Sequence, residues 1–247
     1  MKIKTINWVI LLAGLLIIGS CKKDNTESTT NPNTQLTLKV THQVDGKELI
    51  FDSMCYVNAG GNKYSVTKLN YYLNGFVLTT KNGDKVYLNG YTYIDGRNPN
   101  NQISIGGFSP GTFTNLSFYI GLDPQHNVSG ALENSLNNIN MAWPEVIGGG
   151  YHFLKMEGYY LDSIHAKQGF TMHLGTNEML VKHVSLPLTI TLADNGSSTI
   201  NLSMNLNEWF KNPHTWDFNK DGNYTMAIPE LMTLLKNNGT DVFTIQP

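Results

Sequence analysis

Apolar and polar residues alternate along most of the chain. Between Leu36 and Val44, leucine, valine and histidine side chains occupy every second position, which is typical of a strand with one buried face. The Asp45-Gly46 pair that follows predicts a tight hairpin turn. Comparable stretches predict further strands over 48–51, 64–80, 85–93, 102–105, 113–121, 151–160, 170–174, 182–193 and 199–206.

Helical spacing is confined to two places. Residues 228–236 carry apolar side chains at helical intervals and end at Asn-Asn-Gly, so we expect a helix that stops at Gly239. A shorter helix is expected over 130–140. Many short strands, regular turn signals and one C-terminal helix predict an all-β fold, an antiparallel β-sandwich in a single domain.

The first twenty-one residues follow a different pattern. Lys2 and Lys4 precede an apolar run over 8–18, which is too short to span a bilayer and is typical of a secretory signal. The run ends in Ile-Gly-Ser-Cys21, which resembles the bacterial lipobox, whose cysteine is acylated after cleavage of the preceding peptide bond. The alternative is an ordinary signal peptide with an accidental cysteine.

These features predict a signal peptide over 1–20, a lipid-anchored, disordered tether over 21–35 and a sandwich domain over 36–247. The membrane is then a partner through acylated Cys21, and we expect an outer membrane lipoprotein with a periplasmic or a surface-exposed domain. The formal net charge is −2, and loss of Lys2 and Lys4 makes the mature chain more acidic. No basic run is present in the sequence, which argues against a nucleic-acid partner.

Only two cysteines occur, so acylation of Cys21 leaves Cys55 without a disulfide partner. We expect Cys55 to pack as a small apolar residue, with a copper-binding thiolate as the alternative.

Strand phase separates the histidines. His42 shares its phase with the apolar residues of the first strand, and His152 is in phase with Leu154 and Met156. We therefore expect both imidazoles to point toward apolar faces, with Glu157 on the opposite face of its strand. A buried imidazole needs a hydrogen-bond partner, a metal or water. Several imidazoles that converge would bind copper or zinc, whereas a single one is more often structural.

Five segments of the chain, in this order and spacing, resemble the MbnP-like copper-binding domain: 64–78, 110–121, Met141-Ala-Trp143, 150–158 and 170–175. The resemblance extends over about 36–245. It implies an exported, β-rich protein that binds copper through histidines and a tryptophan oxidised to kynurenine. It also implies a di-haem peroxidase of the MauG type as partner. Trp143 matches the family tryptophan, and His173 matches the histidine of its His-Leu-Gly motif.

On this resemblance we expect a non-enzymatic protein that handles copper at the cell envelope. The expected copper site holds His42, His152 and His173 around the ion, with Trp143 or its oxidised product nearby and His126 as a further candidate. Two departures from the family pattern lie near this site. Pro144-Glu145 stands where the family often has a second tryptophan, and His126-Asn127 reverses the order of a family pair.

A second motif is independent of the family. Residues 217–222 follow the Asp-x-Asn-x-Asp-Gly opening of an EF-hand calcium loop, in which side-chain oxygens converge on a hard cation. Position twelve of this loop is Ile228 instead of the usual glutamate. Either the loop binds a structural calcium, or it is a solvated Asp-Gly turn. The candidate calcium ligands are Asp217, Asn219, Asp221, Asn223 and Glu230.

The sequence contains no nucleophile elbow, metalloprotease motif, phosphate loop or dinucleotide fingerprint. The alternative function is a surface adhesin or glycan-binding sandwich with a structural calcium. Its sugar platform would come from tyrosines that otherwise pack between strands. These tyrosines are Tyr71, Tyr72, Tyr91, Tyr93, Tyr159 and Tyr160.

Overall fold

The computed structural model of the chain describes residues 34–246, apart from the side chains of Asn89 and His183. The expected signal peptide, Cys21 and most of the expected tether therefore lie outside the described residues. Within 34–246, no helix has the length and apolar character that crossing a bilayer requires.

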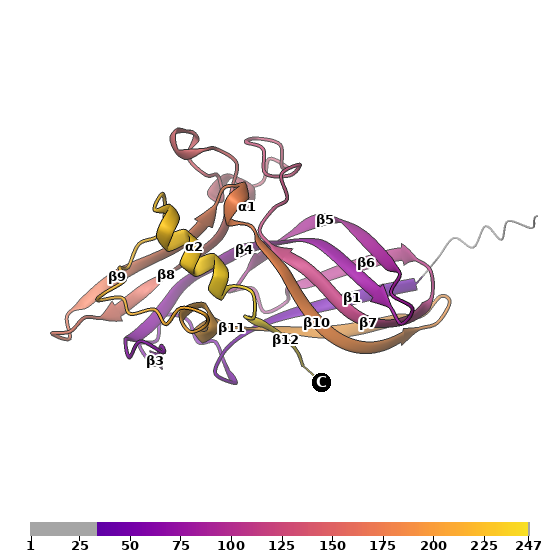
Figure 1. Ribbon diagram of the computed structural model, residues 1–247, viewed down its shortest axis with the longest axis horizontal. Helices are drawn as coiled ribbons and strands as arrows, with labels where there is room; N and C mark the ends of the chain where they lie inside the picture. The colour runs from indigo at the N-terminus through magenta and orange to yellow at the C-terminus, as the bar shows by residue number, and fades with distance from the viewer. Residues whose placement is uncertain (1–33, 247) are drawn as a thin grey trace, which may run out of the picture. The chain divides into compact units, whose positions relative to one another are not determined.

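Two β-sheets form the fold (Figure 1). In the first sheet the strand order is β12–β11–β1–β2, and β6 also pairs with β1. In the second sheet the order is β10–β7–β4–β8–β9, and β3 and β5 also pair with β4. All pairings are antiparallel except that of β1 with β11, which is parallel. The predicted antiparallel β-sandwich is confirmed. The first sheet contains β1 (Thr34–Val44), β2 (Lys47–Glu48), β6 (Gln102–Phe108), β11 (Ser197–Asn205) and β12 (Phe243–Gln246). The second contains β3 (Tyr56–Val57), β4 (Lys63–Thr80), β5 (Lys85–Asp95), β7 (Gly111–Ile120), β8 (His152–Leu161), β9 (Lys167–Gly175) and β10 (Val181–Leu192).

The alternation in the sequence fixes the faces of β1. Buried and solvent-accessible side chains alternate along the strand, and its inward positions are those that the sequence predicts. The turn after β1 uses Asp45 and Gly46 at φ values of 50° and 84°. Positive φ at both central residues is the geometry that a two-residue hairpin requires, and Asp-Gly supplies it at low cost.

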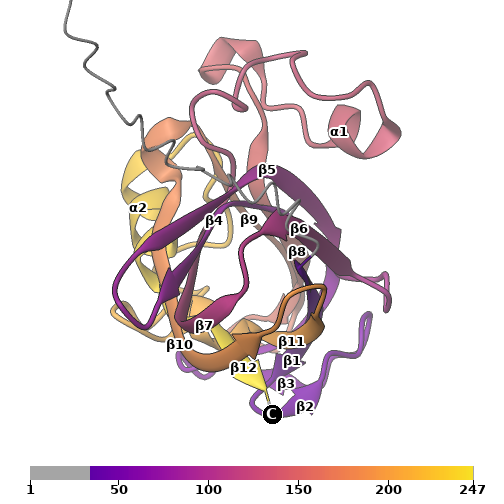
Figure 2. The same ribbon diagram turned by 90° about the vertical axis from the view of Figure 1, so that its right-hand side faces the viewer.

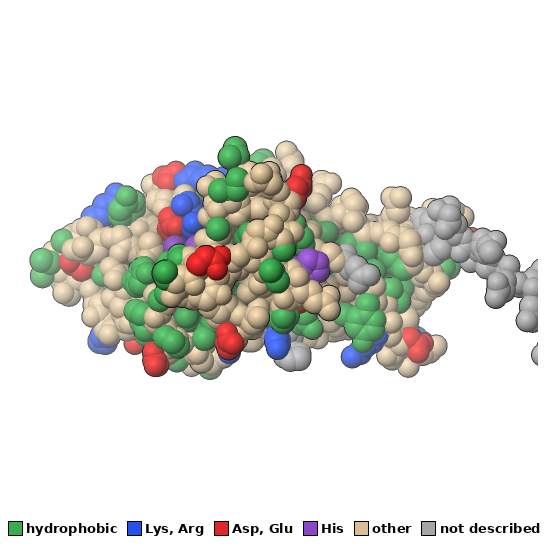
Figure 3. Space-filling model, turned by 90° about the horizontal axis from the view of Figure 1, so that it is seen from above, with side chains coloured by type: hydrophobic (Ala, Val, Ile, Leu, Met, Phe, Trp, Pro, Cys, Tyr) green, Lys and Arg blue, Asp and Glu red, His purple; other side chains and the backbone are tan. Residues whose placement is uncertain are grey.

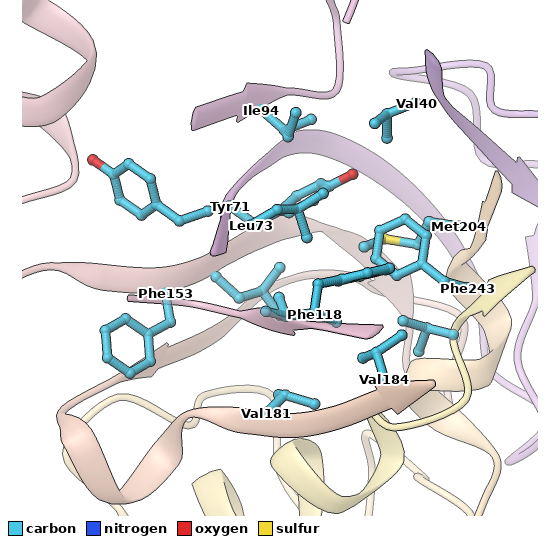
Figure 4. Packing of buried hydrophobic residues seen from close by; sticks show 14 of the residues in the cluster. Val40, Tyr71, Leu73, Ile94, Phe118, Phe153, Val181, Val184, Met204 and Phe243 are labelled. Carbon is cyan, nitrogen blue, oxygen red and sulfur yellow. The ribbon is translucent and has the colours of Figure 1, made fainter. Parts of the chain in front are cut away.

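The core lies between the two sheets, whose strands surround it in the end-on view of Figure 2. Figure 4 shows side chains from both sheets meeting there, including Val40 and Met204 from the first sheet and Tyr71 from the second. Phe118 on β7 and Phe243 on β12 contact edge to face at 5.3 Å between ring centroids. Side chains of β1, β4 and β11 contribute to this core. Because β1 buries only one face, slipping it by one residue would turn its apolar side chains to solvent.

The helices lie at the margins of the sheets. The predicted C-terminal helix is confirmed as α2 (Pro229–Asn238), with Pro229 at its start, and it packs against β9. The helix expected over 130–140 is shorter: α1 (Leu136–Asn140) is capped by Ser135, whose side chain accepts a hydrogen bond from the Asn138 amide. The helix is limited to 136–140 because residues 130–135 are mostly irregular, with a turn at Gly130 and a bend at Leu132. Three short 3-10 helices complete the fold: η1 (Glu145–Ile147), η2 (Asn177–Met179) and η3 (Leu206–Phe210).

Figure 3 views the molecule from above, over α1 and the loops around it. Lysine and arginine side chains lie there in small groups interspersed with acidic side chains, with no broad basic patch on this face.

Candidate metal centre

A β-bulge at the start of β8 decides where His152 points. His152 lies opposite Gly175 on β9, and Leu154 lies opposite Leu174, so β8 carries one extra residue between these two pairs. Gly175 and Leu174 are neighbours and therefore face opposite sides of the sheet, and the same holds for their partners. The prediction that His152 shares a face with Leu154 is wrong, because a strict period of two does not survive a bulge.

The bulge brings His152 onto the same face as His173. The two imidazoles contact edge to face with 5.0 Å between ring centroids. The Trp143 ring also contacts His152 edge to face, at 4.7 Å. The exposed fractions are 2% for Trp143, 4% for His152 and 7% for His173. Three residues that the sequence analysis nominated therefore form one buried cluster.

A glycine makes room for the indole. A Cβ atom on Gly175 would lie 2.3 Å from a ring carbon of Trp143, so only glycine allows the ring to pack against the strand here. The Trp143 side-chain N–H donates to the carbonyl of Ile147 at 3.0 Å, and its backbone N–H donates to the carbonyl of Gly150 at 2.9 Å. Both ends of the tryptophan are thereby fixed beside His152.

Hydrogen bonds assign the tautomers of both histidines. Nδ1 of His152 lies 3.1 Å from the carbonyl oxygen of Met141, which can only accept, so Nδ1 carries the proton and Nε2 keeps the lone pair. Nε2 of His173 lies 3.1 Å from Oε1 of Glu157, which leaves the lone pair of His173 on Nδ1. Nδ1 of His173 is buried and has no hydrogen-bond partner among the described residues. Such an unpaired buried atom costs about 1–3 kcal/mol in an empty site.

The electrostatics keep the lone pair of His152 available. Burial first, and then the nearby His173 and Lys155, lower the pKa of His152 to about 3. The pKa of Glu157 is lowered to about 2, first by the hydrogen bond from His173 and then by Lys68, so Glu157 is ionised. His152 is therefore a neutral imidazole at physiological pH, in the form that binds a metal.

Comparison with known proteins assigns the chain to a family. The model of the MbnP family matches residues 33–228. The chain belongs to the MbnP family. Trp143, His152 and His173 all lie within the matched range. Among solved structures, the chain is similar to MbnP from Methylosinus trichosporium, with 17% identity and a TM-score of 0.47 over 72% of this chain and 77% of that one. No curated protein matches the chain.

In this MbnP-family chain, His42 does not share the cluster. It points into the core, as its phase predicts, and its Nε2 lies 2.8 Å from the hydroxyl of Tyr71. Tyr71 pairs with Leu154 and so faces the opposite side of the second sheet from His173. The expectation that His42, His152 and His173 surround one ion is therefore wrong, because a sheet separates His42 from the other two.

His126 is also placed elsewhere. Its Nδ1 is 2.9 Å from Oδ2 of Asp123, its ring contacts Tyr91 edge to face at 5.4 Å, and Asn74 lies within hydrogen-bond distance. No contact joins His126 to His152 or His173 in the described part of the chain.

The cluster offers two imidazole nitrogens and one indole, which fits some metals and not others. Among residues 34–246, no three His, Cys, Asp or Glu side chains converge as a metal site. A structural zinc ion usually takes four protein ligands, so zinc does not fit. Monovalent copper accepts low coordination numbers and binds imidazole readily.

Sequence reasoning missed Glu157 because it assigned this residue to the face opposite His152. No local signal in the sequence could have found Glu157, because the bulge that puts it on the same face as His152 depends on how β8 pairs with β9.

The candidate calcium loop has a different set of partners. Oδ1 of Asp217 accepts from Asn62 and from the Asn219 amide, and Oδ2 of Asp217 pairs with Lys220 at 3.1 Å. Oδ2 of Asp221 accepts from the Asp217 amide at 2.7 Å. The remaining candidates point elsewhere: the Asn223 amide donates to the carbonyl of Gly169, and Glu230 is exposed on α2. Both oxygens of Asp217 and one of Asp221 are therefore engaged by protein groups, which favours the Asp-Gly turn of the two alternatives. The calcium alternative stays untested.

Two further expectations concern surface chemistry. Cys55 is exposed and free, so the expectation that it packs as an apolar residue is wrong.

The tyrosines proposed as a sugar platform mostly pack inside the protein. Tyr72, for example, contacts Tyr91, Tyr93 and Tyr151 edge to face, and only Tyr159 of the six is exposed. These tyrosines therefore do not form one exposed platform.

Proposed function

We propose that this MbnP-family chain binds copper between His152 and His173, beside Trp143. One observation carries the proposal: Nδ1 of His173 is a buried lone pair without a partner, and it belongs to a ring that contacts a second, neutral imidazole. A bound metal would satisfy the unpaired nitrogen and offset the cost of its burial. Copper would supply a soft, redox-active centre enclosed by apolar and aromatic groups.

The proposal extends to the setting of the protein. We propose a non-enzymatic, lipid-anchored protein of the outer membrane, tethered through Cys21, that handles copper at the cell envelope. We further propose that a di-haem peroxidase of the MauG type oxidises Trp143 to kynurenine. The indole is 2% exposed, so such a partner would act on it from a distance and not by direct contact. The proposed lipid anchor and location depend on the sequence pattern of residues 1–35, and the proposed oxidation of Trp143 depends on the family resemblance.

Copper binding is tested by titrating the metal-free protein with Cu(I) against a chromophoric chelator. The protein is prepared alone and after co-expression with a di-haem peroxidase, and mass spectrometry reports the state of Trp143. We expect His152→Ala and His173→Ala each to abolish high-affinity binding. We expect the matched control His126→Ala to retain it, because His126 lies outside the cluster. Full binding by the His173→Ala variant would refute the proposal.

A further inference from the structure

Glu157 is in contact with His173 and with a lysine at the same time. Its Oε1 accepts from Nε2 of His173, and its Oε2 pairs with Nζ of Lys68, each at 3.1 Å. The Glu157 side chain is 23% exposed and that of Lys68 is 44% exposed, so this pair lies at the edge of the buried cluster. Lys68 therefore holds one carboxylate oxygen while the other faces the imidazole.

The backbone of His173 is fixed as well. Its amide donates to Oγ1 of Thr225 at 2.7 Å, and its carbonyl accepts from the same hydroxyl at 2.8 Å. With the backbone held, two contacts orient the ring: its hydrogen bond to Glu157 and its edge-to-face contact with His152. That bond also decides the tautomer, because a carboxylate accepts but cannot donate.

We propose that Glu157 is a positioning residue that holds His173 as the Nε2–H tautomer and thereby presents Nδ1 to copper. The assignment of copper as the ligand rests on the proposed function, whereas the tautomer is a property of the metal-free protein. A carboxylate in this place orients the ring and makes the opposite nitrogen, Nδ1, a stronger metal ligand, as carboxylate partners of metal-bound histidines do. The role of Glu157 is indirect, since its own oxygens are occupied by His173 and Lys68.

The tautomer is measured by long-range ¹H–¹⁵N correlation NMR on the metal-free full chain with ¹⁵N-labelled histidine. For His173 we expect a protonated Nε2 and an unprotonated Nδ1. In the Glu157→Gln variant we expect a mixture of tautomers, because an amide can either accept from Nε2–H or donate to an unprotonated Nε2. The charge-matched control is Glu48→Gln, an exposed residue on β2, which should leave the His173 signals unchanged.

Copper affinity is measured on the same proteins by chelator competition. We expect Glu157→Gln to weaken Cu(I) binding by about 10–100-fold, as loss of an outer partner of a metal-bound histidine does. The Glu48→Gln affinity should equal that of the wild type. Because Cu(I) is diamagnetic, the NMR measurement can be repeated on loaded protein, where we expect Nε2 of His173 to keep its proton.

The outcomes separate this proposal from the function on which it rests. If the wild-type protein binds no copper, the proposed function fails while the tautomer measurement still tests Glu157. If the wild-type protein binds copper but metal-free His173 carries its proton on Nδ1, the proposal is overturned, whether or not the variant folds. Unchanged tautomer and affinity in Glu157→Gln would also overturn it. The proposal would also be overturned if Nε2 of His173 lost its proton when copper binds, because the metal would then lie between Glu157 and His173.

Discussion

Replacing His42 with glutamine tests the electrostatics of the core. His42 is 8% exposed, and within residues 34–246 its side chain has one hydrogen-bond partner, the hydroxyl of Tyr71. Burial lowers the pKa of His42 from 6.5 to about 4, and the charge of Asp95 opposes this shift only partly. Glutamine keeps a polar group that can accept from Tyr71, but it does not titrate.

The direction of the pH effect follows from the proton balance. Between about pH 6.5 and about pH 4 the unfolded chain binds a proton at His42 that the folded chain does not. The stabilisation is therefore complete above the unfolded pKa and is lost as the pH falls toward the folded pKa. One pKa unit corresponds to about 1.4 kcal/mol, and integrating the proton balance between these two pKa values shows that His42 removes about 2.5 kcal/mol from the free energy of unfolding between about pH 7.5 and about pH 4.5.

The assay is urea unfolding followed by tryptophan fluorescence at about pH 7.5 and about pH 4.5. The wild-type protein should lose about 2.5 kcal/mol more between these conditions than His42→Gln, since contributions from His152 and from carboxylates are common to both and cancel. His165→Asn, in an exposed turn at a φ of 61° that asparagine tolerates, should behave like the wild type. Equal losses in the wild type and His42→Gln would show that His42 is not held neutral in the core.

Two further predictions concern the shape of the cluster and the acidic loop. Gly175→Ala should lower the free energy of unfolding by about 1–3 kcal/mol in urea titrations, because the new Cβ would meet the Trp143 ring at 2.3 Å. Gly169→Ala on the same strand, whose Cβ would have its nearest neighbour at 3.9 Å, is the control, and equal costs for both would contradict the packing argument. Adding calcium to chelator-treated protein should leave the Tm unchanged, because Asp217 would have to give up its pair with Lys220. A calcium-dependent rise in Tm that Asp217→Ala abolishes would instead establish a cation site.

Local sequence patterns were sufficient where a side chain's position depends only on its own strand. The phase of β1 correctly placed His42 on the inward face, and the Asp45-Gly46 turn has the expected positive φ values. The apolar spacing and glycine stop correctly located α2. Two short strands escaped prediction, as did the three 3-10 helices. β3 pairs over two residues and β12 over four, and both exist because a longer neighbouring strand offers them hydrogen bonds.

The cluster of Trp143, His152 and His173 shows what the sequence alone determined and what it did not. The residue types Trp143, His152 and His173, and their membership in an MbnP-like pattern, are present in the sequence. Which of the imidazoles meet was decided only by the tertiary structure. One extra residue on β8 turns His152 to the other face of the sheet, beside His173, while His42 remains in the core on the far side. A bulge depends on the register between two strands, and register is a property of their pairing that the local pattern of neither strand contains.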